Sequence, residues 1–130
     1  MSRKMLPGEI ERTSMEIIAG ELAQRGIVIP PEQEAVVKRV IHTTADFDFA
    51  QTLRFSEHAV DLGVTALKQG TNIVTDTNMA RSGVSRPSLA KLGGQVFCYM
   101  ADEDVARAAK ENGTTRAVAA MEKMAREQPG

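Results

Sequence analysis

The chain has 130 residues, 42% of them apolar and 25% charged, which is typical of a single soluble globular domain. Its 16 basic and 17 acidic residues leave a net charge of −1, which excludes nucleic-acid binding through a broadly basic surface. The single cysteine, Cys98, excludes an internal disulfide framework and predicts a reducing, cytoplasmic location.

The first part of the chain predicts two helices joined by a short extended segment. Pro7 suits the first turn of a helix over about residues 7–25, and Gly26 suits its end. Residues 27–29 form either a short β-like stretch or an extended linker. Pro31 then suits the first position of the second helix. The side chains expected to be buried are Ile10, Met15, Ile17, Ile18 and Leu22 of the first helix and Val36, Val37, Val40 and Ile41 of the second.

Helices and apolar strands alternate in the rest of the chain. The predicted elements are a helix over 57–69 with Ser56 as its N-cap and Gly70 as its stop, a strand over 71–77, a loop over 81–94, a strand over 95–100, a helix capped by Asp102 that runs to 112, and a last helix opened by Thr114 or Thr115 that runs to about 127. Apolar strands with helical crossovers indicate an α/β fold with a parallel sheet. Two or three strands are few for such a sheet, so we expect dimerisation or a longer chain to complete the domain.

Polar residues follow the first of the predicted strands. In open α/β sheets, ligands bind beyond the C-terminal ends of the strands. Asp76 lies at such an end, and the segment after it carries Arg81 and Arg86. Asp76 is therefore a ligand-binding residue, an N-cap or a turn former, and the two arginines are either anion-binding or solvated surface residues. Residues 100–102, after the other strand, form a second candidate region.

Arg39 and His42 lie three positions apart, which places them on one edge of the second predicted helix. A histidine can donate or accept a proton near neutral pH, and an arginine can bind a carboxylate with two hydrogen bonds. The alternative is that His42 is a cation that stabilises the C-terminal end of the helix. Spacing alone leaves both interpretations open.

Motifs for metal and nucleotide chemistry are absent from the sequence. The two histidines, Cys98 and Asp76 show none of the short ligand spacings of zinc sites. There is no GxxxxGK, GxGxxG or GxSxG motif. No apolar run is long enough to span a membrane, and no signal peptide is evident. We therefore expect no cofactor, no protein metal ligand, no nucleic-acid partner and no membrane partner, and we interpret His58 as a surface residue.

Four segments carry distinctive motifs, in order and without large gaps: "IERTSMEIIAGEL" (10–22), "VKRVIHTTADFDFA" (37–50), "LRFSEHAVDLGVTALKQGTNIVTDTNMARSGVSR" (53–86) and "ENGTTRAVAAME" (111–122). On these motifs the chain resembles the precorrin-8X methylmutase family and its cobalt-precorrin-8 counterpart in the anaerobic cobalamin pathway. The resemblance covers almost the whole chain.

The resemblance implies a flavodoxin-like, three-layer α/β/α fold with a mainly parallel sheet, incomplete in this chain, and a homodimer. Residues 1–130 would be a single α/β domain that matches the N-terminal part of a longer methylmutase. The implied activity is that of an isomerase, an intramolecular transferase that moves a methyl group from C11 to C12 of a precorrin-8 macrocycle. The "TTADFDFA" segment favours cobalt-precorrin-8 over precorrin-8X. The alternative is a non-catalytic α/β module that binds a corrinoid or another tetrapyrrole.

The resemblance also implies roles for individual residues. His42 matches the catalytic histidine of the family, which acts as proton donor and acceptor. Ser14 and Arg39 match its substrate contacts. By position, further substrate-binding residues are expected at Asp76, Met79, Arg86, Thr115 and Arg116. The arginines and hydroxyls would hold the acetate and propionate arms of the corrinoid.

Overall fold

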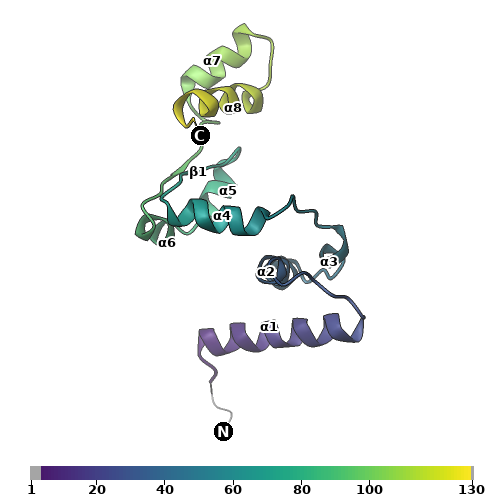
Figure 1. Ribbon diagram of the computed structural model, residues 1–130. Helices are drawn as coiled ribbons and strands as arrows, with labels where there is room; N and C mark the ends of the chain where they lie inside the picture. The colour runs from purple at the N-terminus through teal and green to yellow at the C-terminus, as the bar shows by residue number, and fades with distance from the viewer. Residues whose placement is uncertain (1–3, 130) are drawn as a thin grey trace. The chain divides into compact units, whose positions relative to one another are not determined.

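The computed structural model describes residues 4–129 (Figure 1). The chain divides into two units between Leu62 and Gly63, and each unit has its own apolar core. The core of the first unit consists of Ile18, Leu22, Val37 and Ile41. The core of the second unit consists of Tyr99, Val105, Ala109, Ala119 and Ala120. Each unit therefore has its own packing.

The first unit is helical, with α1 (Pro7–Gln24), α2 (Glu34–Thr44) and the single turn α3 (Phe49–Thr52). α1 begins as predicted, with Pro7 in its first turn, and it ends before Gly26, whose φ of 67° only glycine adopts easily. α1 packs against α2 through the shared core. The aromatic side chains of residues 47, 49 and 55, in α3 and the segments beside it, pack against this core.

Three expectations for the first unit need correction or refinement. Residues 27–29 form an extended linker and not a strand. α2 begins at Glu34 and not at Pro31, because the Gln33 N–H donates to the Pro30 carbonyl at 2.9 Å and closes a turn first. Only part of each apolar stripe is buried. Ile10 and Ile17 are 50% and 65% exposed, because the helix face that meets α2 carries Ile18 and Leu22 instead; Val36, 39% exposed, also lies outside the core.

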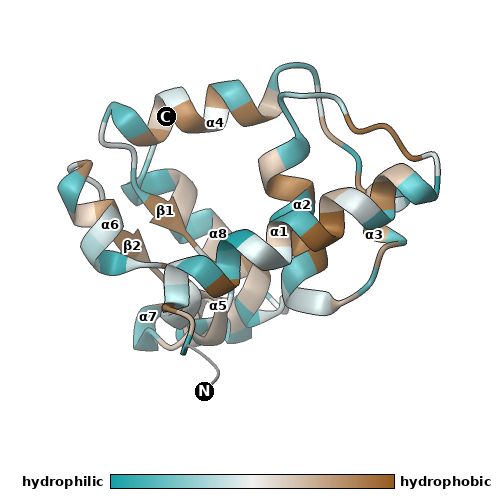
Figure 2. Cartoon of the chain, turned by 90° about the horizontal axis from the view of Figure 1, so that it is seen from below, coloured by the Kyte–Doolittle hydropathy of each residue, from teal (hydrophilic) through white to brown (hydrophobic). Residues whose placement is uncertain are grey.

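The second unit contains a parallel pair of two-residue strands. The elements from the unit boundary onward are α4 (Ala59–Lys68, which spans the boundary), β1 (Ile73–Val74), α5 (Asn78–Gly83), α6 (Arg86–Lys91), β2 (Val96–Phe97), α7 (Glu103–Glu111) and α8 (Arg116–Glu127). Ile73 lies opposite Val96, and Val74 lies opposite Phe97. Both strands are hydrophobic (Figure 2). The predicted parallel sheet is confirmed, although each strand is shorter than expected.

α7 and α8 form a helical hairpin that packs on the sheet. Val105 and Ala109 of α7 meet Ala119 and Ala120 of α8, and side chains of both strands pack against this cluster. The Thr115 hydroxyl caps α8 by accepting a hydrogen bond from the Val118 N–H at 3.2 Å, as predicted.

Lys123 of α8 bridges two carboxylates at the start of α7. Its Nζ lies 2.9 Å from an oxygen of Asp102 and 2.9 Å from an oxygen of Asp104. Asp102 stands at the N-cap position of α7 as predicted, but its side chain makes no cap hydrogen bond and pairs with Lys123 instead.

Two further local predictions are wrong. The segment predicted as a loop over residues 81–94 contains the end of α5 and all of α6. Its Ser and Pro residues start a helix here, with Ser85 at the N-cap position and Pro87 in the first turn. Helix α4 begins at Ala59 and not directly after Ser56, because His58 has a left-handed φ of 55° and cannot continue a helix.

The fold class is α/β with a small, incomplete parallel sheet among many helices. Among residues 4–129, no helix combines the length and the apolar character needed to cross a membrane.

Candidate functional site

Arg39 and His42 are held by α2, whose opposite side is anchored in the core. Val37 and Ile41 are 2% and 1% exposed, and they bury one face of the helix against α1. Arg39 and His42 are exposed, one turn apart. The predicted common edge is therefore present, and it is open to a ligand.

The hydrogen bonds in the last turns of α2 do not involve the His42 imidazole. The Thr43 and Thr44 hydroxyls donate to carbonyls one turn back, at 3.0 and 2.8 Å. The Ala45 N–H donates to another such carbonyl at 2.8 Å, with Ala45 in the left-handed conformation that often ends helices. Among the described residues of its unit, the His42 side chain has no hydrogen bond or ion pair. The imidazole is therefore open to solvent.

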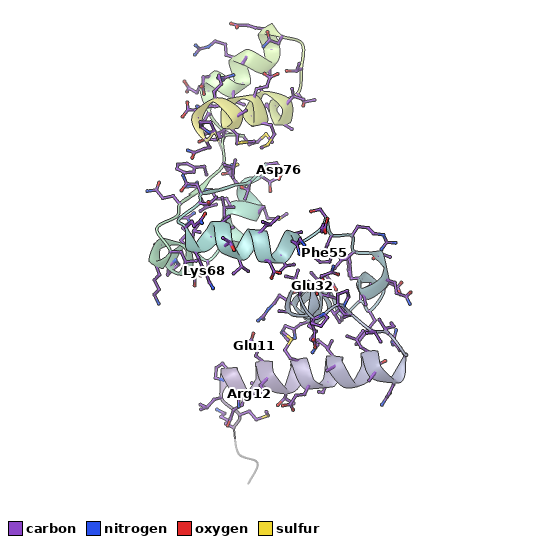
Figure 3. The ribbon with its side chains drawn as sticks, in the orientation of Figure 1. Glu11, Arg12, Glu32, Phe55, Lys68 and Asp76 are labelled. Atoms are coloured by element: carbon purple, nitrogen blue, oxygen red, sulfur yellow. The ribbon has the colours of Figure 1, made fainter. Side chains whose placement is uncertain are left out.

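Arg39 is joined to α1 by an ion pair with Glu11. Glu11 lies on the side of α1 that faces α2 (Figure 3). Ser14 is half-buried. Ser14 and His42 each lie one turn along the helix from a partner of this ion pair, Ser14 from Glu11 and His42 from Arg39.

Glu11 is a residue of this site that the sequence reasoning did not single out. Both partners of its ion pair are about half exposed, with side chains 49% exposed for Glu11 and 58% for Arg39. Only one signal in the sequence points to Glu11. It shares a helix face with Ser14, Ile18 and Leu22, which α1 turns toward α2.

Asp76 and Met79 follow β1 in the second unit. Asp76 lies just beyond the C-terminal end of β1 and is exposed (Figure 3). Thr77, and not Asp76, caps α5, because the Thr77 hydroxyl accepts from the Ala80 N–H at 3.1 Å. Met79 is 83% exposed on α5. Both predicted residues present their side chains to solvent near the strand end.

The other three predicted residues lie elsewhere in the second unit. Arg86 is the first residue of α6 and lines a cleft with Arg81. Thr115 and Arg116 lie at the start of α8, at the end of the α7–α8 hairpin away from Lys123. Among the described residues of this unit, no hydrogen bond or ion pair joins these three residues to one another or to Asp76. Direct polar contacts therefore do not link these residues within the described part of the unit.

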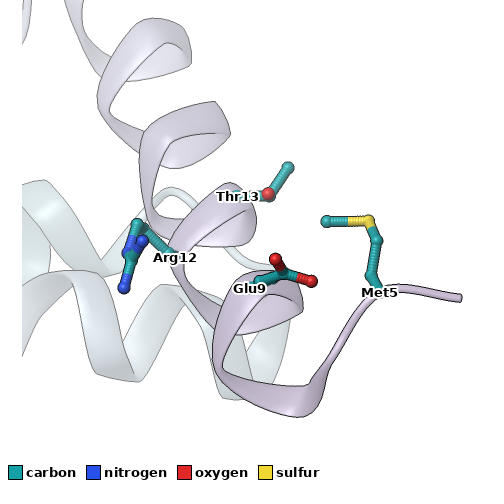
Figure 4. A pocket seen from close by; sticks show the side chains of 4 residues that line it. All are labelled: Met5, Glu9, Arg12 and Thr13. Atoms are coloured by element: carbon teal, nitrogen blue, oxygen red, sulfur yellow. The ribbon is translucent and has the colours of Figure 1, made fainter. Parts of the chain in front are cut away.

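One further hollow in the described chain contains none of the predicted site residues. A hollow along the first turns of α1 is lined by Met5, Glu9, Arg12 and Thr13 (Figure 4). Within residues 4–129, no three His, Cys, Asp or Glu side chains gather closely enough to hold a metal ion.

Comparison with known proteins identifies relatives over nearly the whole chain. The family described as precorrin-8X methylmutase matches residues 9–130. The cobalt-precorrin-8 methylmutase of Salmonella typhimurium is 48% identical over 71% of this chain and 44% of its own length. That of Priestia megaterium is 36% identical over 95% of this chain and 54% of its own length.

A solved structure agrees with the sequence relatives. The precorrin-8x methyl mutase from Thermus thermophilus superimposes with a TM-score of 0.76 at 34% identity, over 88% of this chain and 54% of that one. The chain spans about half the length of the curated relatives that it matches.

Proposed function

We propose a function from one premise: the chain belongs to the precorrin-8X methylmutase family. The complete protein is an isomerase of cobalamin biosynthesis that moves a methyl group from C11 to C12 of a precorrin-8 macrocycle. A family match that runs across both units supports the proposal that residues 1–130 belong to a single α/β domain.

One observation carries the proposal. His42 is exposed at the end of α2 and lacks a hydrogen-bond or ion-pair partner among the described residues of its unit. An imidazole in this position favours general acid–base chemistry on a bound ring.

The reaction needs little from the protein beyond binding and one proton. His42 donates a proton to a ring nitrogen, which draws electron density from the ring and favours migration of the methyl group. The proton returns to His42 after the methyl group has moved, so substrate and product are isomers and no co-substrate is consumed.

Arg39 binds a carboxylate arm of the corrinoid in this mechanism. The Ser14 hydroxyl, one turn from Glu11 on α1, is a second substrate contact. Glu11 occupies Arg39 in the absence of substrate. An exposed ion pair is worth only about 0–1 kcal/mol, so exchange of Glu11 for a substrate carboxylate costs little. Asp76, Met79, Arg86, Thr115 and Arg116 are further substrate contacts, and the protein is a cytoplasmic homodimer.

Cobalt-precorrin-8 is the favoured substrate. In support, the relatives from Salmonella typhimurium, Priestia megaterium and Leptospira interrogans are all called cobalt-precorrin-8 methylmutases. A relative from Pseudomonas aeruginosa, 36% identical, is called precorrin-8X methylmutase. The deciding experiment uses a protein that contains this chain and has the full length of its relatives, called a relative-length protein below. Parallel assays of this protein with both substrates would decide between them.

A second candidate function is a binding module that holds a corrinoid without turnover. The deciding experiment supplies a relative-length protein containing this chain with cobalt-precorrin-8 and follows the absorption of the rearranged product. Product formation supports the isomerase, whereas tight binding without product supports the module.

A further inference from the structure

A cleft in the second unit carries positive charge without a counter-ion. α5, α6 and the start of β2 enclose about 200 Å³. The charged side chains that line it are Arg81 and Arg86, and Gln95 contributes a side-chain amide. Its apolar walls include Leu89 and Val96, which are 5% and 8% exposed. No Asp or Glu lines the cleft.

The Arg81 guanidinium has an unmet hydrogen-bonding need. Its Nε is fully covered, yet within residues 4–129 it has no hydrogen-bond partner. A buried N–H without an acceptor is unfavourable, and a guanidinium offers a planar set of donors that fits the two oxygens of a carboxylate. Arg86 also makes no ion pair among the described residues.

We propose that this cleft binds a carboxylate, held by the guanidinium groups of Arg81 and Arg86. The apolar walls accept the carbon atoms attached to the carboxylate. Two sources share this chemistry: a free small organic acid, and a carboxylate arm of the corrinoid. The second source rests on the proposed function, whereas the first does not.

The position of the cleft separates it from the strand end that carries Asp76. The cleft is lined by residues 94–96, at the N-terminal side of β2, whereas Asp76 follows the C-terminal end of β1. Arg81 and Arg86 therefore lie at the other end of the parallel pair from Asp76, and Arg86 contacts the substrate only if a corrinoid arm occupies the cleft.

Titration of the 130-residue chain with sodium acetate tests the proposal, with the Nε–Hε resonance of Arg81 followed by NMR at constant ionic strength. We expect a saturable shift with acetate and none with chloride. Arg81→Lys keeps the charge but loses the planar fork, so it should weaken acetate binding about tenfold or more. Arg107→Lys, an exposed arginine of α7, is the matched control and should bind acetate like the unaltered chain.

The absence of a saturable shift, an equal response to chloride, or unchanged affinity in Arg81→Lys would each overturn the site. Amide spectra of the variants show whether they fold, and the titration of the unaltered chain needs no variant. Hydrogenobyrinate, the product expected from rearrangement of precorrin-8X, is then added to the acetate-bound chain and separates the two sources. Displacement of acetate assigns the site to a corrinoid arm, and persistence of acetate assigns it to free carboxylates. Turnover by the relative-length protein is measured separately, so failure of the site and failure of the isomerase are distinguishable.

Discussion

His42 is exposed in the last turn of α2 and lies one turn from Arg39. We predict that His42→Asn in a relative-length protein lowers turnover by about 10²–10⁴-fold, because asparagine forms hydrogen bonds but delivers no proton near neutral pH. Product affinity and folding should remain. If His42 only stabilised the helix end, the change would cost about 0.3–1 kcal/mol of unfolding free energy and leave most of the turnover. Rate and thermal denaturation, measured on one preparation, distinguish the two.

Arg39 and Glu11 allow a paired test of substrate binding. Arg39→Ala in a relative-length protein should weaken binding of the coloured product by about ten- to a hundredfold, since a charge-assisted bond contributes about 1.5–3 kcal/mol. Arg39→Lys should recover only part of this loss.

Glu11→Gln should act in the opposite direction, because it removes the carboxylate that competes for Arg39. Product affinity should rise or stay level, and stability should fall by no more than about 1 kcal/mol, as for an exposed ion pair. A loss of affinity equal to that of Arg39→Ala would show that the ion pair serves to hold α1 on α2 and not to await a ligand.

At the scale of elements, the α7–α8 hairpin contains a pH-sensitive contact. The hydrogen bond from Lys123 lowers the pKa of Asp104 below its ordinary value of 3.8, and partial burial opposes this effect. The same contacts, with Asp102 and then Asp104, raise the pKa of Lys123. A carboxylate with a lowered folded-state pKa stabilises the fold above its unfolded value, and this contribution is lost as the pH falls through the folded value.

We therefore predict that the hairpin loses stability below about pH 4 and that Lys123→Met removes part of this acid dependence. Urea denaturation of the 130-residue chain at a series of pH values between about 3 and 7 measures it. Lys110→Met, an exposed lysine on α7, is the control. If the unfolding free energy falls with pH equally in the unaltered chain and in Lys123→Met, the contact contributes nothing to the acid dependence.

At the scale of the whole molecule, the parallel pair of strands is too small for a complete doubly wound sheet. The relatives are about twice as long as the matched region. We predict that the 130-residue chain alone turns over about 10²-fold or more slowly than a relative-length protein, since small misplacements of a catalytic group have effects of that size. Equal rates, measured at equal concentrations of folded protein, would contradict this.

Much of the local structure could be predicted because local rules decide it. Pro7, Gly26 and Thr115 mark helix ends through their own backbone or hydroxyl, and α1 and α8 follow these signals. The loop predicted over 81–94 was wrong because the same residue types that break structure also start helices. His58 shortened α4 through a backbone conformation that no sequence signal announced.

The candidate site was predictable to a smaller extent. The shared edge of Arg39 and His42 follows from helical spacing alone, and the structure confirms it. The ion pair with Glu11 joins residues 28 positions apart, so no local pattern contains it. The roles assigned to these residues stay predictions.

The sequence by itself determined the helix ends at Gly26 and Thr115, the parallel α/β class and the membership of the family, because these depend on residue types and their order. Only the tertiary structure decided which apolar side chains are buried, as Ile18 is and Ile17 is not. Only the tertiary structure also gave Arg39 its counter-ion and left the Arg81 Nε covered without one. The physical reason is that burial and ion pairing depend on which distant segments meet, and a helix of given sequence can turn either face toward its neighbour.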